Sequence, residues 1–213
     1  MKLNQYIDHT NLKANAKQED LEKLCQEAIE YNFATVAINS CWTSFVASKL
    51  AGSGVGITTC IGFPLGQMST EAKAAEALIA VADGTTEIDM VINVGKLQAG
   101  DDEYVIRDIR RVVEAAKGLP VKVILECCLL SDEEIVRACK DCMEAGAAFV
   151  KTSTGFSTGG ATVEDVKLMA DTVKGVCKVK AAGGIHTKDE ALAMIEAGAN
   201  RLGASAGISI VSE

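Results

Sequence analysis

Three features of the sequence predict an α/β protein with the fold of a (βα)8 TIM barrel, formed as a single domain over residues 1–213. Short runs rich in Val and Ile alternate with longer segments of helical periodicity. Eight such units of about 25 to 30 residues fill the chain, as in a small barrel. Hydrophobic residues make up 48% of the chain and aromatic residues 4%, which suits closely packed parallel strands. The competing architecture, an open doubly wound sheet, needs a glycine-rich turn after the first strand, where this chain has TNLKAN.

The predicted strands are short apolar runs that end in polar or small residues. They cover residues 6–9, 35–39, 56–61, 87–93, 121–126, 148–152, 176–181 and 201–205. The helices predicted between them cover 18–31, 43–51, 69–82, 102–117, 132–145, 162–174 and 187–197. Capping boxes are expected from Ser131 with Glu134, Thr187 with Glu190 and, as a weaker example, Asn15 with Gln18. Glycines are expected to end three helices, at Gly146, Gly175 and Gly198.

The composition argues against several kinds of partner. A formal net charge of −8, without any run of Lys and Arg, speaks against nucleic acid and membrane surfaces. The start, MKLNQYIDHT, lacks an apolar signal core and no apolar run approaches about 18 residues, so a cytoplasmic protein is expected. The eight cysteines are expected to be free thiols, because the chain does not look like a small secreted protein, and the CxxC of Cys139 and Cys142 lies in a helical run without a second CxxC or a nearby His. No metal or other cofactor is expected.

Polar side chains at the carboxyl ends of the strands are the candidates for chemistry, because the active sites of this fold lie there. Lys151 ends the run AAFVK and precedes small residues that leave room for a ligand. Taken alone, such a lysine is more often a side chain that reaches solvent than a nucleophile. Asp89 alternates with Ile88 and Met90, so it should face into the barrel, where a buried carboxylate needs a cation.

Lys180 supplies a cation for Asp89 and a partner for Lys151. It lies 29 residues after Lys151, at the equivalent point of the next unit, so the two ammonium groups should be neighbours. At about 5 Å and an effective dielectric of about 20, their repulsion is about 3 kcal/mol, enough to favour the uncharged form of one of them. The pair therefore predicts a lysine that can form a Schiff base.

Two glycine-rich turns follow the last two predicted strands, AAGGIHT at 181–187 and GASAG at 203–207. Backbone N–H groups in such turns can hold an anion, and barrels often bind phosphate after their seventh and eighth strands. Glycine is also ordinary turn chemistry, so each turn alone is weak. Together they predict a phosphorylated substrate.

Six blocks carry a resemblance to a known family: IDHTNL, IGFPLG, EIDMVINVGKLQAGD, KVILECCLL, FVKTSTGFSTGGAT and KAAGGIHT. In this order they resemble the class I, Schiff-base-forming 2-deoxyribose-5-phosphate aldolases, and the likeness spans nearly the whole chain. The resemblance implies reversible cleavage of 2-deoxy-D-ribose 5-phosphate to acetaldehyde and D-glyceraldehyde 3-phosphate, without metal. It also implies a homo-oligomer, expected as a dimer.

The resemblance implies a role for each candidate residue. Lys151 would form the Schiff base beside Lys180, Asp89 would take part in proton transfer with a bound water, and Asp8 would hold Lys180. Residues implied around the substrate and its phosphate are Thr152, Gly155, Gly183, Gly184, Gly203 and Ser205.

The sequence departs from the family pattern at Ala37, Cys127, Lys178 and His186. His186 stands where Arg is usual, so a weaker or pH-dependent phosphate contact is expected. Two alternatives stay open: another phosphosugar aldolase or isomerase on the same barrel, and a non-catalytic barrel that binds phosphosugars.

Overall fold

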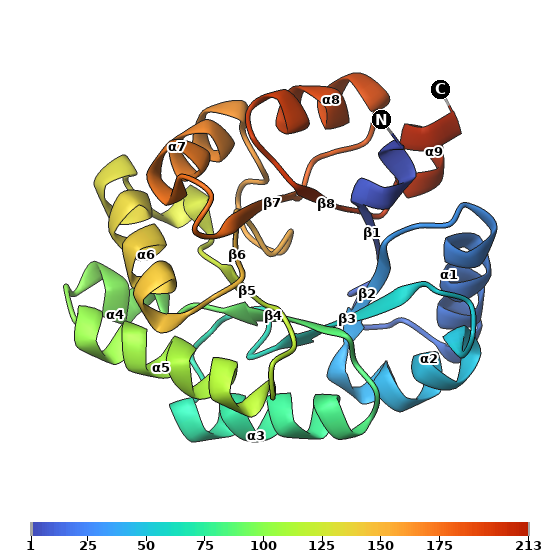
Figure 1. The fold of residues 1–213 in the computed structure, drawn as a ribbon, viewed down its shortest axis with the longest axis horizontal. Helices are drawn as coiled ribbons and strands as arrows, with labels where there is room; N and C mark the ends of the chain where they lie inside the picture. Colours follow the sequence, from blue (N-terminus) through green and yellow to red (C-terminus); the bar gives the residue numbers. More distant parts are fainter. Residues whose placement is uncertain (1, 213) are drawn as a thin grey trace.

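The computed structural model describes residues 2–212, which form a closed barrel of eight parallel strands surrounded by helices (Figure 1). The strands are β1 (Ile7–Thr10), β2 (Thr35–Asn39), β3 (Gly56–Ile61), β4 (Glu87–Val91), β5 (Val121–Ile124), β6 (Phe149–Lys151), β7 (Lys178–Ala182) and β8 (Arg201–Ala204). Each strand pairs in parallel with the next, and β8 closes the barrel on β1. The predicted fold class is confirmed, and each strand overlaps its predicted range.

Helices connect the strands on the outside of the barrel. They are α1 (Gln18–Glu30), α2 (Thr43–Leu50), α3 (Thr70–Ala82), α4 (Val94–Gln98), α5 (Asp102–Ala115), α6 (Asp132–Ala145), α7 (Val163–Val173), α8 (Lys188–Glu196) and α9 (Gly207–Ser212). Short 3-10 helices cover Leu3–Tyr6, Ser40–Trp42 and Cys127–Leu129. The predicted helices agree with the observed ones within two residues at each end. The sequence does not predict α4 and α9, because five and six residues are too few to show a helical period.

Two of the predicted capping boxes are present. At α6 the Ser131 hydroxyl accepts from Glu134 N and the Glu134 carboxylate accepts from Ser131 N. Thr187 and Glu190 form the same motif at α8. Gly146 ends α6 with a φ of 83°, a conformation that glycine adopts without strain.

The predicted cap at Asn15 is wrong. The N-terminal capping residue of α1 is Lys17, and Asp20 closes the first turn by accepting from Lys17 N at 2.9 Å. The Asp20 carboxylate, one turn into the helix, thus pairs with a backbone N–H at the start of α1, where the side chain of Asn15 was expected to cap the helix. Two further expected helix ends lie one residue beyond the observed capping residues, at Gly175 and Gly198.

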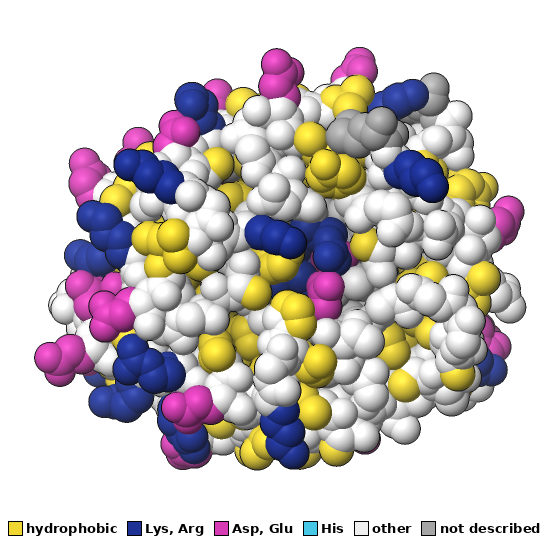
Figure 2. Space-filling model, in the orientation of Figure 1, with side chains coloured by type: hydrophobic (Ala, Val, Ile, Leu, Met, Phe, Trp, Pro, Cys, Tyr) yellow, Lys and Arg dark blue, Asp and Glu magenta, His cyan; other side chains and the backbone are white. Residues whose placement is uncertain are grey.

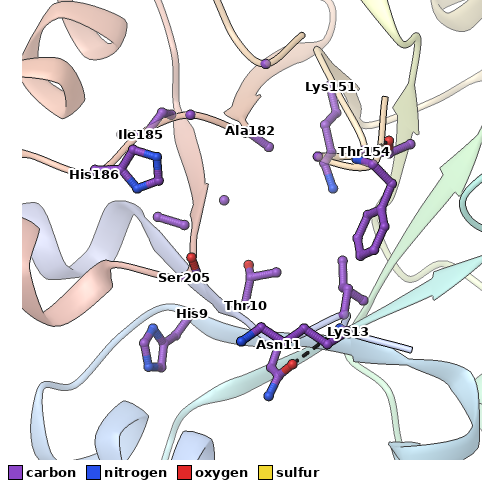
Figure 3. A pocket seen from close by; sticks show the side chains of 18 of the residues that line it. His9, Thr10, Asn11, Lys13, Lys151, Thr154, Ala182, Ile185, His186 and Ser205 are labelled. Atoms are coloured by element: carbon purple, nitrogen blue, oxygen red, sulfur yellow. Dashed lines mark hydrogen bonds between the residues drawn. The ribbon is translucent and has the colours of Figure 1, made fainter. Parts of the chain in front are cut away.

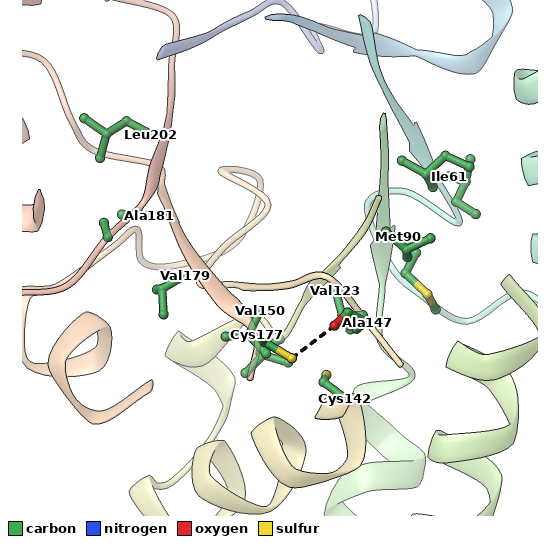
Figure 4. Packing of buried hydrophobic residues seen from close by; sticks show 14 of the residues in the cluster. Ile61, Met90, Val123, Cys142, Ala147, Val150, Cys177, Val179, Ala181 and Leu202 are labelled. Carbon is green, nitrogen blue, oxygen red and sulfur yellow. Dashed lines mark hydrogen bonds between the residues drawn. The ribbon is translucent and has the colours of Figure 1, made fainter. Parts of the chain in front are cut away.

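The apolar core lies between the barrel and the helices, while the barrel interior is polar. Ile61, Met90 and Leu202 have no exposed surface, and Figure 4 shows their side chains pointing away from the barrel interior. Cys139 and Cys142 are buried free thiols of α6, on the side that packs against the barrel. Within residues 2–212 no helix is long and apolar enough to cross a membrane.

Candidate active site

Asp89 lies at the centre of a buried cluster of charges inside the barrel. Its Oδ2 atom accepts from Lys151 Nζ at 2.7 Å and from Lys180 Nζ at 2.8 Å. Its Oδ1 atom accepts from Lys122 Nζ at 2.8 Å. The register of β6 and β7 pairs Lys151 with Lys180, as the 29-residue spacing predicts. Strand alternation places all of these side chains in the interior, where the closed barrel excludes water.

Asp8 forms a second centre of charge below the first. Its Oδ2 atom lies 2.5 Å from Lys180 Nζ, which is the contact that the resemblance implies. Its Oδ1 atom accepts from Arg201 Nη1 at 2.7 Å and from Thr35 Oγ1 at 2.7 Å. Because β1 and β8 are neighbours in the closed barrel, side chains of the first and last strands meet at this carboxylate.

These contacts shift the ionisation of the buried groups. Burial alone would raise the pKa of Asp89, but the charges of Lys122, Lys151 and Lys180 hold that pKa well below its usual range. Burial would lower the pKa of Lys180, yet Asp8 and Asp89 reverse this effect and raise it. Asp89 is therefore a carboxylate and Lys180 an ammonium group at neutral pH.

The interaction of the two lysines differs from the simple repulsion expected from the sequence. Asp89 Oδ2 lies between the two nitrogens and attracts both, so repulsion is one of several interactions that act on Lys151. The sequence reasoning also misses Lys122, Glu87 and Arg201, which join the same cluster. A signal for Lys122 was present, because it alternates with Val121 and Val123 in an apolar strand and must face inward.

A cavity of about 740 Å³ opens at the carboxyl ends of the strands, above this cluster. Lys151 lines it, and Figure 3 shows His186 and Ser205 across the cavity from Lys151 and Thr154. Of the cluster's charged side chains in the described residues, Lys151 alone lines the cavity. Lys180 and Asp89 have no exposed surface and lie beneath it. Within the buried cluster, a bound molecule can therefore reach the nitrogen of Lys151 and not that of Lys180 or Lys122.

The residues implied around the phosphate lie on the β6–β8 side of the cavity: Gly155, Gly183, Gly184, Gly203 and Ser205. Gly183 and Gly184 have φ values of 85° and 78°, which turn the backbone after β7. At Gly203 a Cβ atom would lie 3.2 Å from Lys180 Cε, so a side chain there would press on the buried lysine. His186 also lines the cavity.

Thr152, which the resemblance places at the substrate, is fully buried and does not line the cavity. Its hydroxyl donates to Ala182 O at 3.2 Å and accepts from Ala182 N at 3.1 Å, which ties the end of β6 to β7. The reason is alternation: Lys151 faces into the barrel, so the next residue faces outward.

The loop after Lys151 is held by Glu126, the residue that follows β5 by two positions. Glu126 has a φ of 60°, and its carboxylate accepts from Thr154 N at 3.0 Å and from the Thr154 hydroxyl. A side chain from one strand end thus fixes the loop of the next, and the small residues after Lys151 keep a defined path around the cavity. In the described part of the chain, no group of three His, Cys, Asp or Glu side chains is placed to hold a metal ion.

A TIM barrel with a buried lysine that reaches a cavity beside a charged lysine and a carboxylate defines a class of enzyme that works on carbonyl compounds through an amine. The chain belongs to the DeoC/LacD family of aldolases, whose family model matches residues 2–212. A deoxyribose-phosphate aldolase of Finegoldia magna is 59% identical over 211 residues, 99% of each chain.

Two further relatives agree with this assignment. A deoxyribose-phosphate aldolase of Clostridium novyi is 59% identical over 212 residues, which cover 99% of this chain and 96% of the relative. The solved deoxyribose phosphate aldolase of Aeropyrum pernix, described as tetrameric, superposes with a TM-score of 0.92 at 34% identity. That match covers 99% of this chain and 89% of the relative.

Proposed function

We propose that this protein is an aldolase that reversibly cleaves 2-deoxy-D-ribose 5-phosphate to acetaldehyde and D-glyceraldehyde 3-phosphate. The single observation that carries the proposal is the position of Lys151, the member of the buried cluster that reaches the cavity. The names of the relatives support the substrate. The reaction is a lyase reaction on a phosphorylated sugar in its open-chain form.

Lys151 is the proposed nucleophile. Its uncharged Nζ attacks the C1 aldehyde of the sugar, and the resulting carbinolamine takes up a proton from water in the cavity and loses its hydroxyl as water to give an iminium ion. The iminium withdraws the electron pair of the C2–C3 bond, while the C3 hydroxyl gives up its proton and becomes the aldehyde of glyceraldehyde 3-phosphate. The remaining enamine takes a proton at C2, and water then releases acetaldehyde and restores the amine.

Asp89 is the proposed proton acceptor and donor, acting through a water molecule in the cavity. While the Lys151 nitrogen is positive, Asp89 is held by three cations and is a weak base. Enamine formation removes the charge of that nitrogen, so Asp89 becomes a better proton acceptor at the step that needs one. Lys180 stays charged and, held by Asp8, keeps Asp89 in place.

The phosphate is proposed to bind the backbone of the turns after β7 and β8. Gly155, Gly183, Gly184, Gly203 and Ser205 line that part of the cavity, and backbone N–H groups there can hold an anion. The imidazole of His186 lies on the same side and adds a hydrogen-bonding group to the cavity wall.

Reductive trapping tests the proposal. Acetaldehyde with a cyanoborohydride should add an ethyl group to Lys151, located by peptide mapping, and Lys151→Met should remain unlabelled. A coupled assay should detect glyceraldehyde 3-phosphate released from the sugar. Labelling elsewhere with Lys151 untouched would contradict the role of Lys151. Trapping without product release would contradict the proposed reaction and favour a barrel that binds without turnover.

We also infer that residues 1–213 act as one domain in the cytoplasm and form a homo-oligomer, expected as a dimer. The tetrameric relative from Aeropyrum pernix supports self-association. Light scattering should give twice the chain mass of 22.3 kDa, and a single-chain mass at micromolar concentration would contradict the dimer. Fractionation of cells that express the protein from its own gene tests the location.

A further inference from the structure

The buried charges extend through the barrel to its amino-terminal end, opposite the cavity. Glu87 and Arg201 begin β4 and β8, and their side chains are 15% and 16% exposed. Figure 2 looks onto this end and shows basic side chains gathered around an acidic one at the centre of the face. The two ends of the barrel are therefore connected by charged side chains.

A continuous series of ion pairs leads from Glu87 to Lys151. Glu87 Oε2 lies 2.6 Å from Lys122 Nζ, and the same nitrogen lies 2.8 Å from Asp89 Oδ1. Asp89 Oδ2 in turn lies 2.7 Å from Lys151 Nζ. Lys122 and Asp89 have no exposed surface, so water screens these interactions weakly. A change of charge at Glu87 must therefore be felt at Lys151.

The number of charges shows which state the network favours. In the described residues it holds three carboxylates, Asp8, Glu87 and Asp89, and four basic groups, Lys122, Lys151, Lys180 and Arg201. Fully ionised, the network carries one cation in excess, and an uncompensated buried charge is costly. Loss of the proton of Lys151 balances the network, and Lys151 is the member that the cavity admits to water.

We propose that Glu87 and Lys122 are positioning residues that control, from the amino-terminal end of the barrel and through Asp89, how readily Lys151 gives up its proton. The inference rests on the proposed Schiff-base role of Lys151. Removing the charge of Glu87 leaves a second cation in excess, so Lys151 should lose its proton at lower pH. Removing the charge of Lys122 cancels the excess, so Lys151 should keep its proton to higher pH.

Other groups around Lys151 stay the same in both variants and cannot produce opposite shifts. From the barrel these are Asp8, Cys60, Asp89, Lys178, Lys180 and Arg201, and from the cavity His9, Lys13, Asp20, Lys23, Glu27 and His186. Burial raises the pKa of the Cys60 thiol to about 11, so it carries no charge over the pH range of interest. The exposed Lys178 lies over the Phe149 ring at 5.6 Å from its centroid, at the amino-terminal end.

The test compares Glu87→Gln and Lys122→Met in the full chain. The readout is the rate of reductive trapping of acetaldehyde at Lys151, measured by intact mass from about pH 5 to about pH 9. In the plot of trapping rate against pH, the midpoint of the rise from acid pH should fall by about 0.5 to 1 pH unit in Glu87→Gln and increase by a similar amount in Lys122→Met. Below the midpoint, this corresponds to trapping about three to ten times faster in the first variant.

Two controls separate charge from structure. Glu71→Gln removes a carboxylate on the outer face of α3, where it pairs with Arg111, and should leave the midpoint unchanged. Glu87→Asp keeps the charge and should restore the wild-type midpoint. If Lys122→Met does not fold, Glu87→Gln against Glu87→Asp decides the question alone. Unchanged midpoints, or shifts in the same direction in both variants, would overturn the inference while the trapping itself leaves the proposed function intact. Failure of trapping in the wild-type protein would instead overturn the proposed function.

Discussion

Replacing Lys180 with Met removes the ammonium group between Asp8 and Asp89 while keeping a side chain of similar length. Lys180 and both carboxylates are fully buried, and breaking a buried ion pair by removing one partner costs about 3 to 5 kcal/mol. Asp8 keeps Arg201 and Asp89 keeps two lysines, so the lower end, about 3 kcal/mol, is expected. Urea unfolding measures this loss of stability.

The same variant should make Lys151 harder to deprotonate. Lys151 Nζ and Lys180 Nζ both lie within 2.8 Å of Asp89 Oδ2, so they are no more than about 5.5 Å apart. At about 5 Å and an effective dielectric of about 20, the lost repulsion is about 3 kcal/mol, or about two pH units. The midpoint of the acid limb for reductive trapping should therefore rise by up to about two units, and turnover at neutral pH should fall steeply.

A surface variant provides the control for Lys180→Met. Lys167→Met removes a lysine from an exposed pair with Asp171 on α7, and we expect neither stability nor the trapping midpoint to change appreciably. A midpoint in Lys180→Met equal to that of the wild-type protein would refute the electrostatic reasoning. Loss of stability without a shift would show that Lys180 acts as a structural residue only.

The remaining predictions concern stability outside the lysine pair. Burial, with Asp102 nearby, raises the pKa of Asp141 to about 7 from 3.8. The folded state therefore binds this proton more tightly than the unfolded state, and stability should fall as the pH rises from about 4 to about 7. Urea titrations at several pH values should show that Asp141→Asn reduces this dependence of stability on pH. Thr152→Val should lower the free energy of unfolding in urea by about 1 to 3 kcal/mol, because it leaves the Ala182 N–H unpaired. The KM for the sugar should change less than about twofold. A large change in KM would show that Thr152 contacts the substrate. Lys73→Met should cost about 3 to 5 kcal/mol, because Asp108 would stay buried without the ammonium 2.6 Å away, and thermal melts that show no loss would contradict this.

The sequence predicts the barrel and the first members of the buried charge cluster well, because both follow from local patterns. Strand alternation places Asp89 inside, and the 29-residue spacing places Lys180 beside Lys151. The same alternation, applied consistently, would have turned Thr152 away from the cavity and Lys122 toward Asp89.

The rest of the cluster depends on closure of the barrel, which no local pattern reveals. Asp8 and Arg201 are 193 residues apart and meet because β8 returns to β1. Strand alternation puts Glu87 on the same face as Asp89, but its contact with Arg201, which begins a strand on another part of the barrel, depends on the closed fold. The cap of α1 also escaped prediction, since Lys17 is not a typical capping residue.

The burial of Lys180 and Asp89 beneath the cavity separates two properties that are often changed together, the choice of the amine that reacts and the rate at which it reacts. In the proposed mechanism, access decides which amine reacts, because a substrate in the cavity meets the nitrogen of Lys151 and no other nitrogen of the cluster. In the same mechanism, buried charges that the substrate never touches set how fast that amine reacts. The proposal therefore predicts that substitutions below the cavity floor change the rate and the pH range, while the shape that selects the substrate is left as it is.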